Sequence, residues 1–176
     1  MSEALLFTPE GTSRLLHSWF QRILSSYQKG QTPLVVAIQK GGVPVVERLL
    51  DLWEKQTGTR PESGTLDVSM HRDDLSSRTA PLIEPTDLPA DLMDRDVLLV
   101  DDVIQSGRTI RAAMDSLHDF GRPSRVRLAV LIDRGERQVP ICPDFTGRQV
   151  TARKGEKIAF LPANPDIGDR VVITGA

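Results

Sequence analysis

Apolar residues in this chain alternate between runs that fit buried strands and spacings that fit helices. Leu34–Ile38 and Val97–Val100 are short, continuous apolar runs, as in strands that are buried on both faces. Each run leads through a short loop into apolar residues at helical spacing, in residues 43–56 and 109–117. A third strand-like run covers residues 124–132. This alternation predicts an α/β domain with a central, mostly parallel sheet flanked by helices.

Other segments extend the pattern on both sides of these units. Residues 12–28 place apolar side chains every three or four positions, which predicts an amphipathic helix. Gly64–Met70 alternates and predicts another strand. After it the periodicity is lost in a polar, proline-rich stretch, which we expect to be a flexible lid at about residues 71–95. We expect the short β-like runs of the C-terminal third to form a small hood at about residues 133–160.

Composition sets limits on the kind of protein. A chain of 176 residues fits a single domain covering residues 1–176. The net charge of −2 gives no global basic field for nucleic acid, so any RNA contact has to be local. The lone cysteine, Cys142, excludes an intrachain disulfide. Because neither a signal peptide nor a membrane-spanning run is recognisable, we expect a cytoplasmic protein that makes no membrane contact.

The loop after the second apolar run carries the candidate chemistry. Asp101 and Asp102 follow this run directly, at the strand end where parallel sheets bind ligands. The next main-chain amides would lie at a helix N-terminus, where unpaired N–H groups and the helix dipole attract an anion. Gly107 lets the backbone approach closely. We therefore predict a site for a phosphorylated sugar, with its phosphate held by Ile104, Gln105, Ser106, Gly107, Arg108 and Thr109.

A second loop of this kind follows the first apolar run. Gln39, Lys40 and Gly41 stand between a buried strand and a helix, and Lys40 would supply positive charge to a diphosphate. A plain strand-to-helix turn would have the same composition. The acidic pair at 101–102 could likewise be an ordinary strand end followed by helix-capping residues.

The complete stretch 97–109 favours a ligand site at the acidic pair over an ordinary strand end. It contains an apolar run, two acids, a short variable part and Ser-Gly-x-Thr, and it resembles the signature of type I phosphoribosyltransferases that binds phosphoribosyl pyrophosphate (PRPP). The resemblance implies the type I phosphoribosyltransferase fold. It also implies that Gln39, Lys40 and Gly41 occupy the position of the pyrophosphate loop.

Further stretches resemble the PyrR family of pyrimidine-operon attenuation regulators. They are residues 64–75, 108–115, 121–124 and 128–135, and the similarity extends from about residue 12 to the end. PyrR proteins bind leader mRNA in response to uridine nucleotides, and many also convert uracil and PRPP into UMP and pyrophosphate. The resemblance thus implies PRPP, uracil, UMP and UTP as ligands, pyrimidine-operon leader mRNA as a partner, and a homodimer or larger homo-oligomer.

The resemblance also implies roles for individual residues. Asp101 and Asp102 would accept hydrogen bonds from the ribose hydroxyls and stabilise positive charge at C1. Arg72, in the expected lid, and Lys40 would neutralise the leaving pyrophosphate. A Mg²⁺ ion would be held mainly by PRPP oxygens and water, without a direct protein ligand. Main-chain groups would bind uracil at Ile132, Asp133 and Arg134.

Several positions depart from the family pattern. Gln39-Lys40 replaces Thr-Arg, His71 replaces a tyrosine of the loop, and Gln105 replaces an aromatic residue. The positions associated with RNA carry Ser18, Trp19, Arg22 and Cys142. These departures leave two alternatives open: a nucleotide-sensing RNA-binding attenuator without significant enzyme activity, and a phosphoribosyltransferase for another base.

Overall fold

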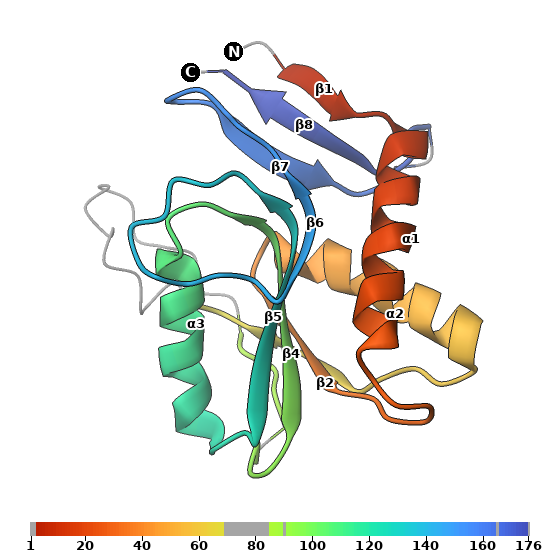
Figure 1. The fold of residues 1–176 in the computed structure, drawn as a ribbon, viewed down its shortest axis with the longest axis vertical. Coiled ribbons are helices and arrows are strands. Elements are labelled where there is room, and N and C mark those ends of the chain that lie inside the picture. Colours follow the sequence, from red (N-terminus) through yellow and green to blue (C-terminus); the bar gives the residue numbers. More distant parts are fainter. Residues whose placement is uncertain (1–2, 69–84, 90, 165, 176) are drawn as a thin grey trace.

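The protein, seen in a computed structural model, is built on two sheets, and the structure describes residues 3–68, 85–89, 91–164 and 166–175 (Figure 1). The larger sheet has five parallel strands in the order β3-β2-β4-β5-β6. Their bounds are β2 Leu34–Ile38, β3 Ser63–Leu66, β4 Asp96–Ile104, β5 Arg125–Asp133 and β6 Phe145–Gln149.

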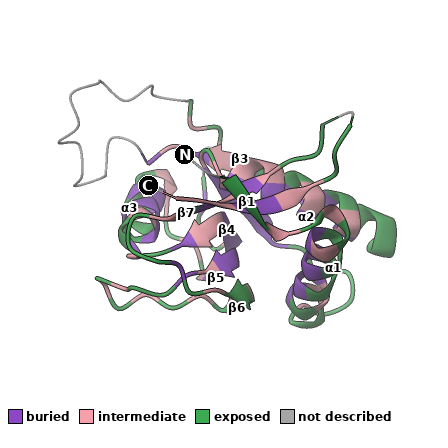
Figure 2. Cartoon of the chain, turned by 90° about the horizontal axis from the view of Figure 1, so that it is seen from above, coloured by how far each residue is buried: buried purple, intermediate pink, exposed green. Residues whose placement is uncertain are grey.

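Among the described residues, three helices cover this sheet, two on one face and one on the other (Figure 1). Helices α1 (Pro9–Ser25) and α2 (Gly42–Thr57) share the first face, and α3 (Arg108–Leu117), followed by the short 3-10 turn η2 (His118–Phe120), covers the second. Alternate residues of each strand serve the two faces, so β2 directs Val35 and Ala37 toward α1 and α2. Figure 2 shows that the buried side of α1 faces inward.

The first helix begins earlier than its apolar pattern predicts. It runs over Pro9–Ser25 rather than 12–28, because Thr8 is the N-cap: its Oγ1 accepts a hydrogen bond from the Gly11 amide at 3.2 Å. Pro9 occupies the first turn, where a missing N–H has no cost. None of the helices that the structure describes is long and apolar enough to cross a bilayer.

The smaller sheet is antiparallel and lies above the carboxyl ends of β4 and β5 (Figure 1). It consists of β1 (Glu3–Phe7), β8 (Arg170–Thr174) and β7 (Lys157–Leu161), in that order. We expected a hood from residues 133–160, whereas this sheet takes strands from both chain ends. Strand β6, also within that range, pairs with β5 at the edge of the larger sheet. Pairing between distant segments leaves no local pattern, which explains the difference.

The expected lid is only partly covered by the structure. Residues 69–84 and 90 lie outside the described residues, and Arg72 is among them. The strand predicted at Gly64–Met70 is seen as β3, which ends at Leu66.

Candidate functional site

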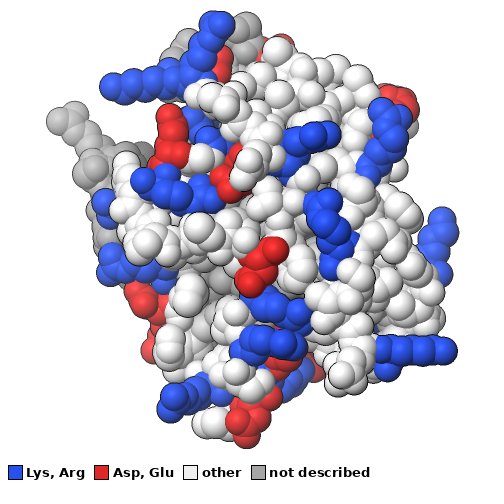
Figure 3. All heavy atoms as spheres, in the orientation of Figure 1, with Lys and Arg blue, Asp and Glu red and all other residues white. Residues whose placement is uncertain are grey.

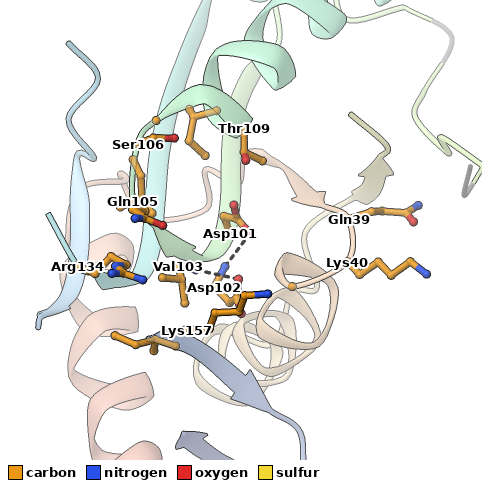
Figure 4. Close-up of a pocket in the computed structure, with 15 residues that line it drawn as sticks. Gln39, Lys40, Asp101, Asp102, Val103, Gln105, Ser106, Thr109, Arg134 and Lys157 are labelled. Carbon is orange, nitrogen blue, oxygen red and sulfur yellow. Dashed lines mark hydrogen bonds between the residues drawn. The ribbon is translucent and has the colours of Figure 1, made fainter. Parts of the chain in front are cut away.

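A pocket of about 440 Å³ opens at the carboxyl ends of β2 and β4 (Figure 4). Both predicted loops contribute to it, since β2 and β4 are neighbours in the sheet. Of the predicted site residues, the pocket is lined by Gln39, Lys40, Gly41, Asp101, Asp102, Ile104, Gln105, Ser106, Gly107, Thr109 and Arg134. Residues 39–41 and 101–110, about sixty positions apart in the sequence, therefore meet at one sheet edge, where parallel sheets bind ligands.

Main-chain amides hold the two acids at the end of β4. The Asp102 amide donates to Asp101 Oδ1 at 2.9 Å, and the Val103 amide donates to Asp102 Oδ1 at 2.8 Å. The other Asp102 oxygen, Oδ2, accepts from the Phe160 amide of the hood at 3.3 Å. Burial raises the pKa of the Asp102 carboxyl, and these amide hydrogen bonds oppose the rise. The structure thus brings both carboxylates into one pocket although they are adjacent on a strand.

The phosphate loop, residues 105–109, turns the chain from β4 into α3. Gly107 has φ +84°, in the left-handed region, and is the N-cap of α3. A Cβ on Gly107 would lie 2.8 Å from Val139 Cγ2. The Arg108 amide donates to Ser106 Oγ at 3.3 Å, which closes the turn. Glycine is therefore required here by the backbone conformation and by the neighbouring Val139.

A wrapping segment, residues 134–141, lies against the outside of the phosphate loop. Its donors occupy three successive carbonyls, that of Ile104 at the end of β4 and those of Gln105 and Ser106 in the loop. These hydrogen bonds are Arg134 N to Ile104 O (3.1 Å), Arg137 Nη1 to Gln105 O (2.8 Å), Gln138 N to Ser106 O (2.9 Å) and Val139 N to Ser106 O (3.2 Å). Because the carbonyl oxygens are engaged there, they do not present negative dipoles to an anion in the pocket.

The loop at residues 39–41 lines the pocket on the side opposite the phosphate loop. The peptide between Gln39 and Lys40 is cis. Figure 4 shows both side chains pointing away from the acids. Gln39 Nε2 donates to Thr65 Oγ1 at 3.2 Å and to the Pro85 carbonyl at 2.9 Å. The loop thus lines the pocket while its two long side chains extend outward, and Gly41 lies against the carboxylate of Asp102.

Other predicted site residues occupy different environments. Within the part of the chain that the structure describes, Ile132 and Asp133 do not line the pocket: Ile132 is buried in the sheet, and Asp133 pairs with Arg137 at 2.7 Å. Arg134 lines it with a guanidinium whose Nη1 donates to the Glu156 carbonyl at 2.7 Å. Arg108 is turned outward and donates from Nε to Gln138 Oε1 at 2.8 Å.

Some lining residues were not predicted from the sequence. They are Val103, Ile110, Lys157 and Ile158. Lys157 is the most consequential, since Figure 4 shows its side chain reaching into the pocket from β7 toward Asp102. In the sequence it is one of several basic residues of the C-terminal third, with no motif around it. The packing of β7 over β4 brings it to the site.

A model of the phosphoribosyl transferase domain family matches residues 10–155, and the chain belongs to that family. A solved hypoxanthine-guanine phosphoribosyltransferase from Bacillus anthracis shares the fold, with a TM-score of 0.66, 17% identity, and 84% of this chain and 83% of that one covered. These matches confirm the predicted type I phosphoribosyltransferase fold.

Relatives with higher sequence identity identify the family within the phosphoribosyl transferases. The bifunctional protein PyrR of Corynebacterium efficiens is 37% identical over 163 residues, which cover 92% of this chain and 85% of the relative. That of Syntrophobacter fumaroxidans is 46% identical over 143 residues, covering 81% and 77%. Within the phosphoribosyl transferases, the chain is therefore of the PyrR family, and the resemblance found in the sequence is confirmed.

Proposed function

We propose that this protein is a uracil phosphoribosyltransferase, which converts uracil and PRPP into UMP and pyrophosphate, and that it also regulates pyrimidine biosynthesis genes. The single observation that carries the proposal is the meeting of Asp101 and Asp102 with the phosphate loop in one pocket. This pairing matches a ribose 5-phosphate: carboxylates can accept hydrogen bonds from its diol, and main-chain amides can donate to its phosphate.

Each group of lining residues would bind a different part of PRPP. The phosphate loop would bind the 5′-phosphate at the N-terminus of α3. Asp101 and Asp102 would accept from the ribose hydroxyls and stabilise the positive charge that develops at C1 when pyrophosphate leaves. We assign the pyrophosphate to the main chain of residues 39–41, with Arg72 and Lys157 supplying positive charge.

The donor set also fits Mg²⁺. Two carboxylates line the pocket, and an ion of this kind typically takes one or two protein carboxylates and completes its shell with phosphate oxygens and water. When bound with PRPP, Mg²⁺ would offset the charge of the pyrophosphate. Asp101 and Asp102 would hold it, whereas the family resemblance alone implies no direct protein ligand.

The remaining part of the substrate pair is the base. We assign uracil to main-chain groups near Arg134, the one member of the predicted base loop that lines the pocket. The test is an assay with PRPP and labelled uracil, hypoxanthine or guanine in parallel. We expect a nucleotide product from uracil alone. A product from hypoxanthine or guanine would indicate a purine phosphoribosyltransferase. If no base gives a product while UMP still binds, the protein would be a nucleotide sensor without this enzyme activity.

The regulatory half of the proposal is binding of pyrimidine-operon leader mRNA in response to UMP by a cytoplasmic homo-oligomer. Figure 3 shows Lys and Arg side chains spread over one face, interrupted by acidic and uncharged ones. Arg14, Arg22 and Arg148 surround a depression of about 490 Å³ between α1 and β6, which offers phosphate contacts. A gel shift over a range of salt concentrations tests this: affinity for leader RNA should exceed that for unrelated RNA and rise with UMP.

A further inference from the structure

Glu136 joins the two sides of the pocket through a single oxygen atom. Its Oε2 accepts from Gln105 Nε2 at 2.8 Å and from Arg134 Nη2 at 3.1 Å. Gln105 belongs to the phosphate loop, and Arg134 lines the pocket where we place the base. The carboxylate therefore bridges two residues from different parts of the ligand site.

The local backbone is arranged to make this bridge. Glu136 has φ +60°, which a non-glycine residue rarely adopts, and it follows Gly135 at φ +73°. Two successive left-handed residues turn the chain back on itself, so the Glu136 side chain returns to Arg134 two positions earlier. Backbone outliers of this kind are concentrated at functional sites, where the surroundings hold them in place.

The bridge also fixes the Arg134 guanidinium, whose side chain is 5% exposed. Nη1 is held by the Glu156 carbonyl and Nη2 by Glu136. Removal of Glu136 would leave a buried cation with one of its two holding contacts and would free the Gln105 side chain at the same time.

We propose that Glu136 is a positioning residue that couples the phosphate loop to the base side of the pocket. The idea rests on the proposed function, because it takes the ligand to be a nucleotide that occupies both sides. Glu136 itself need not touch the ligand. It holds Gln105 and Arg134 in a common geometry, so that a ligand bound on one side finds the other side already ordered.

The test is a double-mutant cycle of Gln105→Ala and Glu136→Ala in the full chain, read by the KM values for PRPP and uracil, kcat, and UMP binding by calorimetry. We expect each single variant to weaken UMP binding and to raise both KM values by about fivefold to tenfold, with a smaller change in kcat. The double variant should be little worse than either single one. Glu136→Gln, whose amide oxygen still accepts from Gln105, should lie between wild type and Glu136→Ala.

A second measurement needs no ligand. In Glu136→Ala, amide hydrogen exchange should quicken in residues 104–109 and 134–139, with the rest of the chain and the melting temperature close to wild type. Asp119→Ala, which removes an exposed acid far from the pocket, is the matched control and should change none of these quantities.

Three results would overturn the positioning role of Glu136. If Glu136 contributed only negative charge at the rim, its removal would tighten binding of PRPP and UMP, and that outcome overturns the proposal. Unchanged affinity or independent, additive effects in the cycle overturn it as well. Failure of the proposed function looks different: the wild-type protein itself would then neither bind UMP nor form it from uracil.

Discussion

Gly41→Ala tests whether the loop at residues 39–41 sets the position of Asp102. Gly41 has φ −64°, which any residue adopts, so the substitution brings no backbone strain. A Cβ there would lie 2.2 Å from Asp102 Oδ1 and 2.5 Å from Cγ. Ordinary contact begins near 3.4 Å, so the carboxylate has to shift by more than 1 Å. That shift would break its hydrogen bond from the Phe160 amide.

A misplacement of this size costs about 100-fold in rate when it moves a group that acts on the reacting centre. A loss of that order corresponds to about 2.7 kcal/mol of transition-state stabilisation. We therefore expect kcat for UMP formation to fall by about two orders of magnitude in Gly41→Ala, with the circular dichroism spectrum preserved. The assay is steady-state turnover of uracil at saturating PRPP.

Gly11→Ala is the matched control, because a Cβ at Gly11 meets nothing closer than 3.5 Å. It should retain wild-type turnover and should slightly favour α1, since alanine is the better helix former. Full activity in Gly41→Ala would show that the position of the Asp102 carboxylate does not limit the reaction, and the role assigned to that residue would then fall.

Four other predictions concern the same site and the opposite end of the sheet. Gly107→Ala forces a left-handed φ on alanine and places its Cβ 2.8 Å from Val139 Cγ2. The free energy of unfolding, measured in urea, should fall by about 1–3 kcal/mol. Calorimetry should show a weaker affinity for UMP, and an unchanged affinity would refute the assignment of the phosphate to this loop. Asp102→Asn should lower kcat about 1000-fold. Because burial raises the pKa of Asp102 and the ionised form is the active one, the wild-type kcat/KM should fall with decreasing pH at a midpoint above the usual 3.8, and a wild-type midpoint at or below that value would contradict this. Burial likewise raises the pKa of Tyr27 to about 12, with Arg127 opposing the rise. Since Tyr27 is the sole tyrosine, tyrosinate absorbance should rise around pH 12, and titration near 10 would refute the described burial. Because the unfolded chain ionises first, stability should fall as pH rises from about 10 to about 12.

The parallel sheet and the phosphate loop were predictable because their signals are local. A continuous apolar run, such as Val97–Val100, predicts a strand buried on both faces, and all four of its residues are fully buried in β4. The acids lie at the end of β4 and Ser-Gly-x-Thr follows a few residues later in the chain, so their proximity required no knowledge of tertiary structure. The family resemblance drew on the same stretch.

The parts that escaped prediction depend on pairing over long distances. Lys157 enters the pocket because β7 pairs with β8 and packs over β4, and none of these contacts is marked in the local sequence. The same applies to the outward direction of Lys40, which its position beside Gly41 did not indicate. A loop's contribution to a pocket can thus be foreseen while the directions of its side chains cannot.

The antiparallel sheet has a practical consequence for altering the chain. Glu3 lies opposite Thr174 in the register of β1 and β8, so residues near the two ends are already neighbours (Figure 1). A short peptide could connect them, and new termini could then be opened at an exposed turn such as Gly58, remote from the pocket. Shortening the N-terminal segment is more disruptive, because it removes β1 from the sheet whose opposite edge, β7, carries Lys157 into the pocket.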